Sequence, residues 1–167
     1  KQVGLNVASD PFIAASTTGI NGGMVAIVAD DPGAHSTQNE QDTRHYAKLA
    51  KVPMLEPSDS QEAYDMMAYA FDISEKFDTP VLVRSSTRIS HSKSVVEVNG
   101  SRATPAKQPS FKHDVEKYVM LPVHARLRRP FMEERLVKVA EYAETFPYNQ
   151  IICGERRLGV VSSGVAY

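Results

Sequence analysis

The order of apolar and polar positions along the first half of the chain predicts alternating helices and strands. Residues 4–18 carry a helical pattern, in one piece or two, and the glycines of TTGINGG end it. The continuous apolar run MVAIVA at 24–29 is typical of a strand buried on both faces. A helical pattern over 44–50 and a short apolar stretch at 53–57, which predicts a second strand, follow.

The clearest helix is predicted over 58–77, and the buried strand TPVLVRSS follows it. Either Ser58 with Gln61 or Asp59 with Glu62 can form a capping box at its start. Its apolar residues at helical spacing are Ala63, Met66, Met67, Ala70, Ile73 and Phe77. The alternation predicts an α/β fold with a mainly parallel sheet and helices on both faces.

The second half of the chain has a different organisation. Residues 99–122 are rich in Gly, Pro, Ser and Lys and predict a linker that separates a domain at 1–98 from a unit at 123–167. That unit is expected to hold a long connecting helix and the opening strand of a second domain, LGVVSSGVAY at 158–167. The helix residues expected to share one face are Met132, Leu136, Ala140, Ala143 and Phe146. The chain begins at Lys1 and stops after an apolar run, so we expect a piece of a longer protein.

Composition and charge exclude several classes of function. The 167 residues carry a net charge of −1, which does not favour a nucleic-acid or membrane-surface partner. No apolar run has the length of a membrane-spanning helix. The single cysteine, Cys153, leaves no internal disulfide framework or cysteine-rich cluster site, and a reducing cytoplasm is the expected location.

A dense polar block follows the strand at 24–29. In parallel sheets ligands bind beyond the carboxyl ends of the strands, where this block would lie. Its amides, hydroxyl, imidazole and guanidinium suit a small anion such as a carboxylate, which arginine can clamp with two hydrogen bonds. The block comprises Asp30, Asp31, His35, Ser36, Gln38, Asn39, Glu40, Gln41, Asp42 and Arg44.

A structural interpretation of the same block is also open. Residues 30–33, Asp-Asp-Pro-Gly, make a good turn, and NEQD can be the acidic first turn of the next helix. For any single residue, composition alone favours this reading. His35 and His45 do not have a metal-ligand spacing, and GINGG lacks the spacing of a phosphate-binding loop, so no metal ligand is predicted.

Five stretches of the sequence resemble one family. They are KQVGLNVASDP (1–11), GGMVAIVADDPGAHSTQNEQDTR (22–44), PMLEPSDSQEAYD (53–65), TPVLVRSSTRISHS (79–92) and LGVVSSGVAY (158–167). In this order they resemble the thiamine-diphosphate-dependent 2-oxoacid:ferredoxin oxidoreductases, in particular the α subunits of the indolepyruvate enzymes. The resemblance implies a pyrimidine-type thiamine-binding domain over 1–98, incomplete at its N-terminus. It also implies the entry to a transketolase-C-terminal-like domain over 123–167.

The resemblance implies an activity of the whole enzyme. Such enzymes decarboxylate an arylpyruvate such as indolepyruvate oxidatively, pass the electrons to ferredoxin and form an aryl-acetyl-CoA. The implied cofactors are thiamine diphosphate with Mg²⁺, and 4Fe-4S clusters that lie elsewhere in the subunit. The implied partners are a β subunit, ferredoxin, CoA and the 2-oxo acid, in a dimer or heterotetramer. This stretch alone is expected to be inactive, because it lacks the activating glutamate, a GDG motif and cluster cysteines.

The same resemblance gives roles to the polar block. His35 is expected to donate to the developing alkoxide, and Arg44 to clamp the carboxylate or anchor the loop. The residues expected to line the substrate or cofactor are Asp31, Ser36, Gln38, Asn39, Glu40 and Asp42. Two alternatives stay open: a related enzyme for another 2-oxo acid, and a non-catalytic dimerisation or scaffold domain that has kept only the fold.

Overall fold

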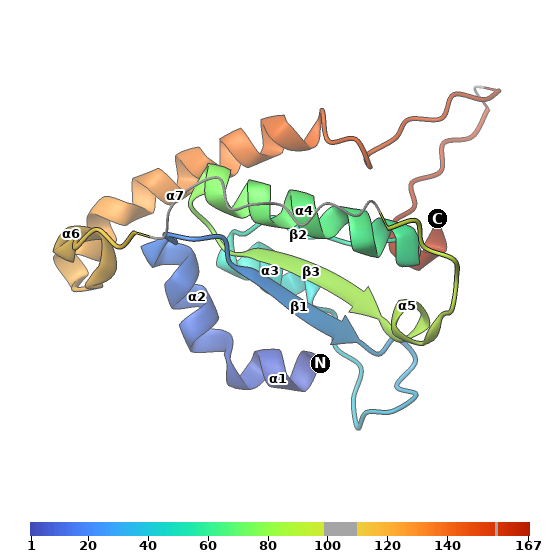
Figure 1. Cartoon of the computed structure of the whole chain (residues 1–167), viewed down its shortest axis with the longest axis horizontal. Helices are drawn as coiled ribbons and strands as arrows, with labels where there is room; N and C mark the ends of the chain where they lie inside the picture. Colours follow the sequence, from blue (N-terminus) through green and yellow to red (C-terminus); the bar gives the residue numbers. More distant parts are fainter. Residues whose placement is uncertain (99–109, 156) are drawn as a thin grey trace.

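The computed structural model describes residues 1–98, 110–155 and 157–167. In this part of the chain a three-stranded parallel sheet has the order β1-β3-β2 (Figure 1). Its strands are β1 (Val25–Asp30), β2 (Met54–Leu55) and β3 (Val81–Ser86). Val25 lies opposite Val81, and Asp30 lies opposite Ser86. Because all three strands run in one direction, their carboxyl ends share one edge of the sheet.

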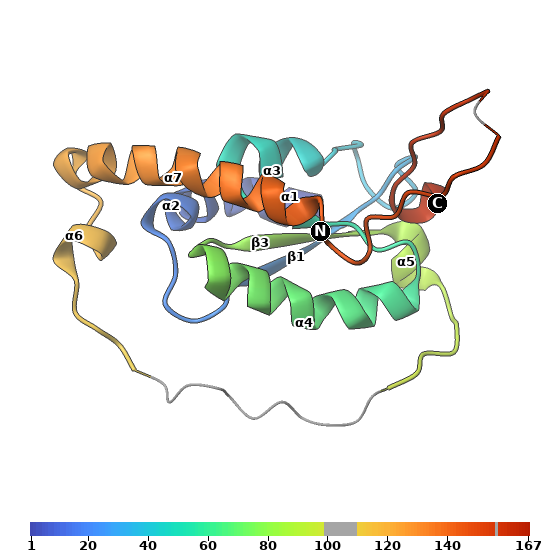
Figure 2. The same ribbon diagram turned by 90° about the horizontal axis from the view of Figure 1, so that it is seen from above.

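Helices cover both faces of this sheet (Figure 2). One face packs on α1 (Gln2–Val7), α2 (Ser9–Thr18) and α3 (Arg44–Ala50), and the other on α4 (Ser60–Phe77). The remaining described elements are α5 (Thr87–His91), α6 (Val115–Tyr118), α7 (Pro122–Ala143) and the 3-10 helix η1 (Gly164–Ala166). The predicted α/β class, with a parallel sheet between helical layers, is confirmed.

The start of α4 follows one of the two predicted caps. The Asp59 carboxylate accepts a hydrogen bond of 2.8 Å from the backbone N–H of Glu62. The Glu62 carboxylate accepts one of 2.7 Å from the backbone N–H of Ser58. The apolar face of α4 buries Met66 and Ile73, among other residues, against the sheet. The alternative cap, Ser58 with Gln61, does not form.

Charged contacts join α6 and α7 to the end of α4. The carboxylate of Asp78, the residue after α4, accepts hydrogen bonds from Lys117 Nζ at 2.8 Å and Arg128 Nη2 at 2.9 Å. Arg135 is buried and donates to the backbone oxygens of Asp78 and Ser16, each at 2.8 Å. Burial lowers the pKa of Arg135 to about 10, because the charged form loses hydration.

The face of α7 differs from the prediction. Met132 and Phe146 are buried as expected, but Leu136 and Ala140 are exposed, and Phe146 lies beyond the end of the helix. The buried side of α7 includes Arg135, whose guanidinium donates to two backbone carbonyls while its aliphatic stem packs inward. An apolar periodicity could not anticipate an arginine on the buried side.

The strand expected at 158–167 does not form. Residues 158–163 have no strand partner among the described residues, and Val161 is fully exposed. A strand requires a neighbour that supplies backbone hydrogen bonds, and the three described strands pair only with one another. Of the predicted linker at 99–122, residues 99–109 lie outside the described residues, and 115–118 form α6. The division into domains stays a prediction.

Candidate functional site

Three charged side chains meet at the carboxyl edge of the sheet, two from within strands and one from the residue that follows a strand. Asp30 is the last residue of β1, Arg84 lies within β3, and Glu56 directly follows β2. Arg84 Nε donates to Asp30 Oδ2 at 2.7 Å, and its Nη1 donates to Glu56 Oε1. The Arg84 side chain is 9% exposed and that of Asp30 is fully buried. One guanidinium therefore connects the ends of all three strands.

The same aspartate fixes the base of the polar loop at 31–43. Asp30 Oδ2 accepts hydrogen bonds of 2.9 Å from both the backbone N–H and the hydroxyl of Thr43. Asp30 Oδ1 is buried and has no hydrogen-bond partner among the described residues. The cost of burying this carboxylate is therefore offset by the three donors that reach Oδ2.

The loop begins with a turn that Asp31 holds. Ala34 N–H donates to the Asp31 carbonyl at 3.0 Å, and Gly33 has φ +86°, as the third residue of a type II turn requires. The buried Asp31 carboxylate accepts from the Thr87 hydroxyl and the Ser36 N–H, each at 2.6 Å. The Thr87 hydroxyl, followed by the Ser36 N–H, lowers the pKa of Asp31. Asp31, predicted to line a ligand, is thus engaged in shaping the loop.

The outer part of the loop presents polar groups to solvent. His35, Ser36 and Gln38 are exposed, and their side chains form no hydrogen bond with another described residue. In contrast, Glu40 accepts from the N–H of Gly33 at 3.0 Å, and Asn39 Oδ1 accepts from a neighbouring glutamine of the loop at 2.7 Å. The side chains of His35, Ser36 and Gln38 are therefore available to a ligand, whereas those of Glu40 and Asn39 are occupied within the loop.

Arg44 and Asp42 form a pair of their own. Arg44 Nε and Nη2 donate to the two oxygens of Asp42, at 2.9 Å and 2.7 Å. The hydrogen bond from Arg44 is the main cause that lowers the pKa of Asp42 to about 2. Since this carboxylate already occupies the guanidinium fork, the geometry supports Arg44 as the anchor of the loop more than as a substrate clamp.

Replacing Arg44 with Gln is expected to return the pKa of Asp42 from about 2 towards its ordinary value of 3.8. The folded-state pKa lies below the unfolded one, so the pair stabilises the fold above pH 3.8, and this is lost as the pH falls towards 2. Half of the Arg44 side chain is exposed, so solvent screening limits the effect to below ~1 kcal/mol. Carboxyl NMR titration measures the shift.

The control is Arg88→Gln, which removes the same charge at an exposed position and should leave the pKa of Asp42 low. If Asp42 of the wild-type protein titrates near 3.8, the pairing with Arg44 is contradicted.

Sequence reasoning missed Arg84, Glu56 and Thr43. The signal for Arg84 was present, because a charged residue inside the apolar run TPVLVRSS has to find a counter-charge when that strand is buried. Its partners come from other strands, 54 and 28 positions earlier in the chain, and no local pattern indicates them.

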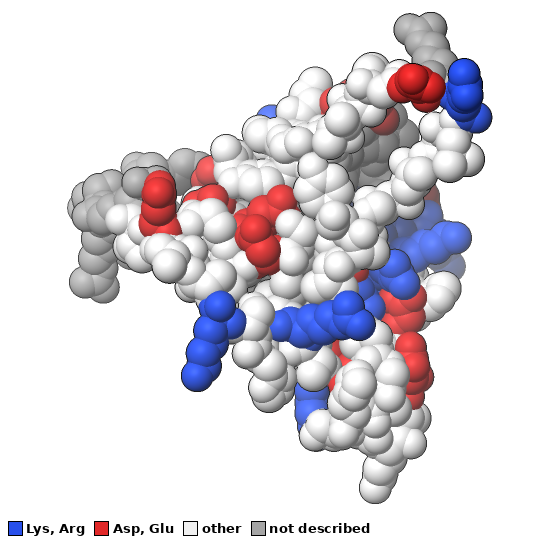
Figure 3. All heavy atoms as spheres, turned by 90° about the vertical axis from the view of Figure 1, so that its right-hand side faces the viewer, with Lys and Arg blue, Asp and Glu red and all other residues white. Residues whose placement is uncertain are grey.

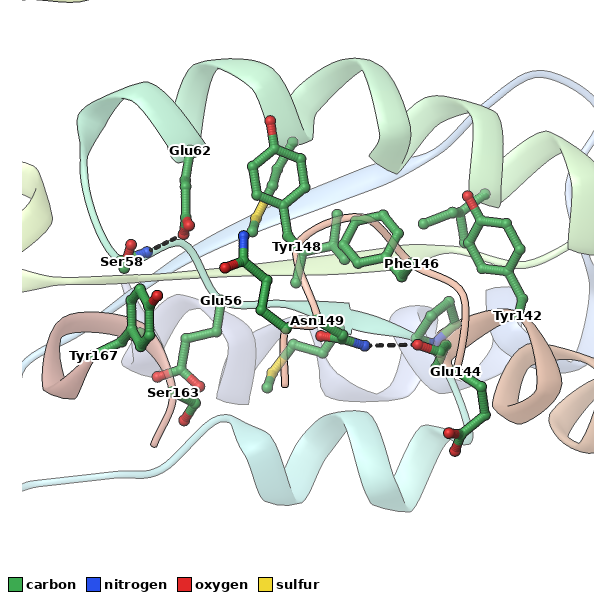
Figure 4. Close-up of a pocket in the computed structure, with 18 of the residues that line it drawn as sticks. Glu56, Ser58, Glu62, Tyr142, Glu144, Phe146, Tyr148, Asn149, Ser163 and Tyr167 are labelled. Carbon is green, nitrogen blue, oxygen red and sulfur yellow. Dashed lines mark hydrogen bonds between the residues drawn. The ribbon is translucent and has the colours of Figure 1, made fainter. Parts of the chain in front are cut away.

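A cavity lies beside β2, and none of its lining residues belongs to the polar loop (Figure 4). It has a volume of about 600 Å³ and lies between α4 and the segments that follow α7. Tyr142, Phe146 and Tyr148 form an aromatic wall, and Glu56 lies near Ser163 at the opposite end. Its lining contains Glu residues but no Lys, Arg or His, so it does not fit an anionic substrate.

Three further observations concern the surface charges, metal binding and the helices. On the face shown in Figure 3, acidic and basic side chains are scattered among neutral residues. Over 1–98, 110–155 and 157–167, no three His, Cys, Asp or Glu residues are grouped so that they could hold a metal ion. None of the helices in these ranges is both long and apolar enough to cross a membrane.

This parallel sheet with a polar loop at its carboxyl edge corresponds to a known family. The family described as pyruvate flavodoxin/ferredoxin oxidoreductase, thiamine diphosphate-binding, matches residues 23–145, and the chain belongs to it. The predicted thiamine-diphosphate-binding fold is therefore confirmed. The matched range includes the whole polar loop, all three strands and α7.

The chain is also similar to proteins named indolepyruvate oxidoreductase subunit IorA. It is 46% identical to the protein of Methanothermobacter marburgensis, 45% to that of Pyrococcus horikoshii and 41% to that of Archaeoglobus fulgidus. Each alignment covers 100% of this chain and 26% or 27% of the relative, so the chain spans about a quarter of these proteins. No solved structure gave a significant match. The predicted resemblance to indolepyruvate oxidoreductase α subunits is confirmed.

Proposed function

We propose that the chain is part of the α subunit of an enzyme that oxidatively decarboxylates arylpyruvates, such as indolepyruvate, to aryl-acetyl-CoA with ferredoxin as electron acceptor. The similarity to the indolepyruvate oxidoreductase subunits over its whole length supports this substrate class. The proposal extends to a β subunit as partner, to assembly as a dimer or heterotetramer, and to a cytoplasmic location.

The observation that carries the proposal is the polar loop between β1 and α3. Its ends are fixed by buried Asp30, while His35, Ser36 and Gln38 remain available at the carboxyl edge of the sheet. In our proposal these groups bind a 2-oxo acid. His35 donates to the carbonyl oxygen as negative charge develops there, and the neutral donors Ser36 and Gln38 orient the carboxylate that leaves as carbon dioxide.

Family membership supports thiamine diphosphate as the cofactor. When bound, it would supply the carbon nucleophile and the electron sink that decarboxylation of a 2-oxo acid requires. The described residues fit the substrate side of such a site, because the loop offers uncharged donors. They do not fit the diphosphate with Mg²⁺, because no carboxylate cluster could hold the metal within these ranges and the Arg44 fork is taken. We place Mg²⁺ and the 4Fe-4S clusters in other parts of the whole enzyme.

The proposal is tested with the complete α subunit, co-assembled with its partner subunit under anaerobic conditions. The measurement is viologen reduction with CoA and thiamine diphosphate, with indolepyruvate, phenylpyruvate, pyruvate or 2-oxoglutarate as substrate. We expect the aryl acids to be preferred. Reduction with pyruvate only would assign the protein to an enzyme for another 2-oxo acid, and no reduction from a cluster-loaded complex would favour the scaffold alternative.

The His35→Ala variant tests the loop itself. We expect kcat/KM for the aryl acid to fall at least about tenfold, the equivalent of losing one hydrogen bond in the transition state. His45→Ala is the matched control, because His45 is also exposed but lies on α3, outside the loop. Equal activities of the two variants and the wild type would exclude His35 as the donor.

A further inference from the structure

Arg84 is buried beneath the polar loop, where it contacts the aspartate that fixes the loop and the glutamate that follows β2. We propose that Arg84 is a positioning residue of the 2-oxo acid site, which sets the loop at 31–43 by bridging Asp30 and Glu56. The inference rests on the function proposed for the loop. Arg84 is assigned no contact with the substrate and acts through Asp30.

The bridge depends on the shape of a guanidinium. Nε reaches Asp30 Oδ2 at 2.7 Å, while Nη1 reaches Glu56 on the other side of the sheet edge. Two different nitrogens thus satisfy two carboxylates at the ends of two non-adjacent strands. A lysine ammonium carries the same charge but at a single point, so it cannot reproduce both contacts in one fixed geometry.

The charges around Arg84 explain how it affects the conformation of the loop. Asp30 and Glu56 carry two negative charges near the single positive charge of Arg84, and Asp42 Oδ1 lies 3.9 Å from Arg84 Nε. Without the guanidinium, these carboxylates repel one another in a poorly hydrated place. Since Asp30 Oδ2 also accepts both hydrogen bonds from Thr43, movement of Asp30 releases the far end of the loop.

The glutamate extends the bridge to the end of the chain. Glu56 Oε1 lies 2.8 Å from where a Cβ on Gly164 would stand, and Gly164 has φ +55°. The turn at η1 therefore packs directly against the carboxylate that Arg84 holds. The loop, the three strand ends and this turn share one charged centre.

The test uses Arg84→Lys and Arg84→Gln in the complete α subunit with its partner subunit. The first readout is hydrogen exchange by mass spectrometry, compared between peptides over 31–43 and peptides from α4. We expect exchange in the loop of Arg84→Gln to accelerate about tenfold more than exchange in α4, with Arg84→Lys in between. The second readout is kinetic: KM for the 2-oxo acid should rise about tenfold in Arg84→Gln while KM for CoA stays constant.

Two further variants keep the test decisive. Arg88→Gln makes the same charge change four positions later, at an exposed residue on α5, and should match the wild type. Glu56→Gln is used in place of Arg84→Gln if that variant does not fold. It keeps the contact between Arg84 and Asp30 but removes the second charge that holds the guanidinium, so faster exchange in the loop is expected here too.

Each outcome either supports or overturns the inference. Wild-type exchange in the loop of Arg84→Lys and Glu56→Gln overturns it. So does acceleration of equal size in the loop and in α4, which indicates general destabilisation. If the wild-type complex turns over no 2-oxo acid, the proposed function fails, and the exchange measurement still decides whether Arg84 holds the loop.

Discussion

Replacing Asp30 with Ala is expected to destabilise the chain by about 3–5 kcal/mol, because it removes the fully buried one of the two carboxylates that hold the buried Arg84. The variant also removes the acceptor for the backbone N–H and hydroxyl of Thr43. Buried donors that lose their partner keep the full cost of lost hydration. A change of this size is a large part of the stability of a typical domain.

Urea denaturation of the chain, followed by circular dichroism, measures this effect as a shift of the midpoint. Asp72→Ala is the matched control, since it removes the same charge from an exposed position on α4, and its midpoint should stay close to that of the wild type. Asp30→Asn should fall between the two, because the amide keeps an acceptor for Thr43 but loses the charge. Equal midpoints for Asp30→Ala and Asp72→Ala would show that the buried network contributes no stability.

Replacing Gly19 with Ala is expected to cost about 2–4 kcal/mol, because strain and a steric clash act together. Gly19 ends α2 with φ +83° and ψ −171°, a region that is essentially restricted to glycine. A Cβ there would lie 2.5 Å from both carboxylate oxygens of Asp78. That carboxylate is held by Lys117 and Arg128, so it cannot move away without breaking those contacts.

Gly22→Ala provides the control for this prediction. Gly22 lies in the same glycine-rich segment, but a Cβ there meets no heavy atom within 4 Å. We expect its effect to remain within about 0.5 kcal/mol. The same urea titration compares the two variants, and a Gly19→Ala midpoint as high as that of Gly22→Ala would contradict the assigned geometry.

Much of the fold could be predicted because its elements carry local signals. The strand at β1 is a continuous apolar run, and the long helix α4 has both a capping pair and a 3.6-residue apolar period. Buried strands separated by helices can pair in parallel, so fold class and the position of the polar loop followed from the sequence. These features depend on neighbours within a few residues, which the sequence displays directly.

The two predictions about the fold that the structure does not match share a physical cause. The strand expected at 158–167 has β-branched residues but no neighbour to pair with among the described residues. On α7, apolar spacing placed Leu136 inward, but two backbone carbonyls far away in the sequence draw Arg135 in its place. Pairing and burial of a charge are decided by partners that only tertiary contact supplies.

In the candidate site, too, local features could be predicted and tertiary contacts could not. The polar composition of the loop and its place after a buried strand could be predicted, because these are local properties of residues 30–44. Which side chains hold the loop, and which remain available, depends on contacts between segments that are far apart in the chain. Asp31 and Asp42 are taken up by Thr87 and Arg44, whereas Arg84 arrives from β3 to bridge two other strands. A buried charge takes the partner that the packed sheet places within reach, and that distance in space is not encoded in any local pattern.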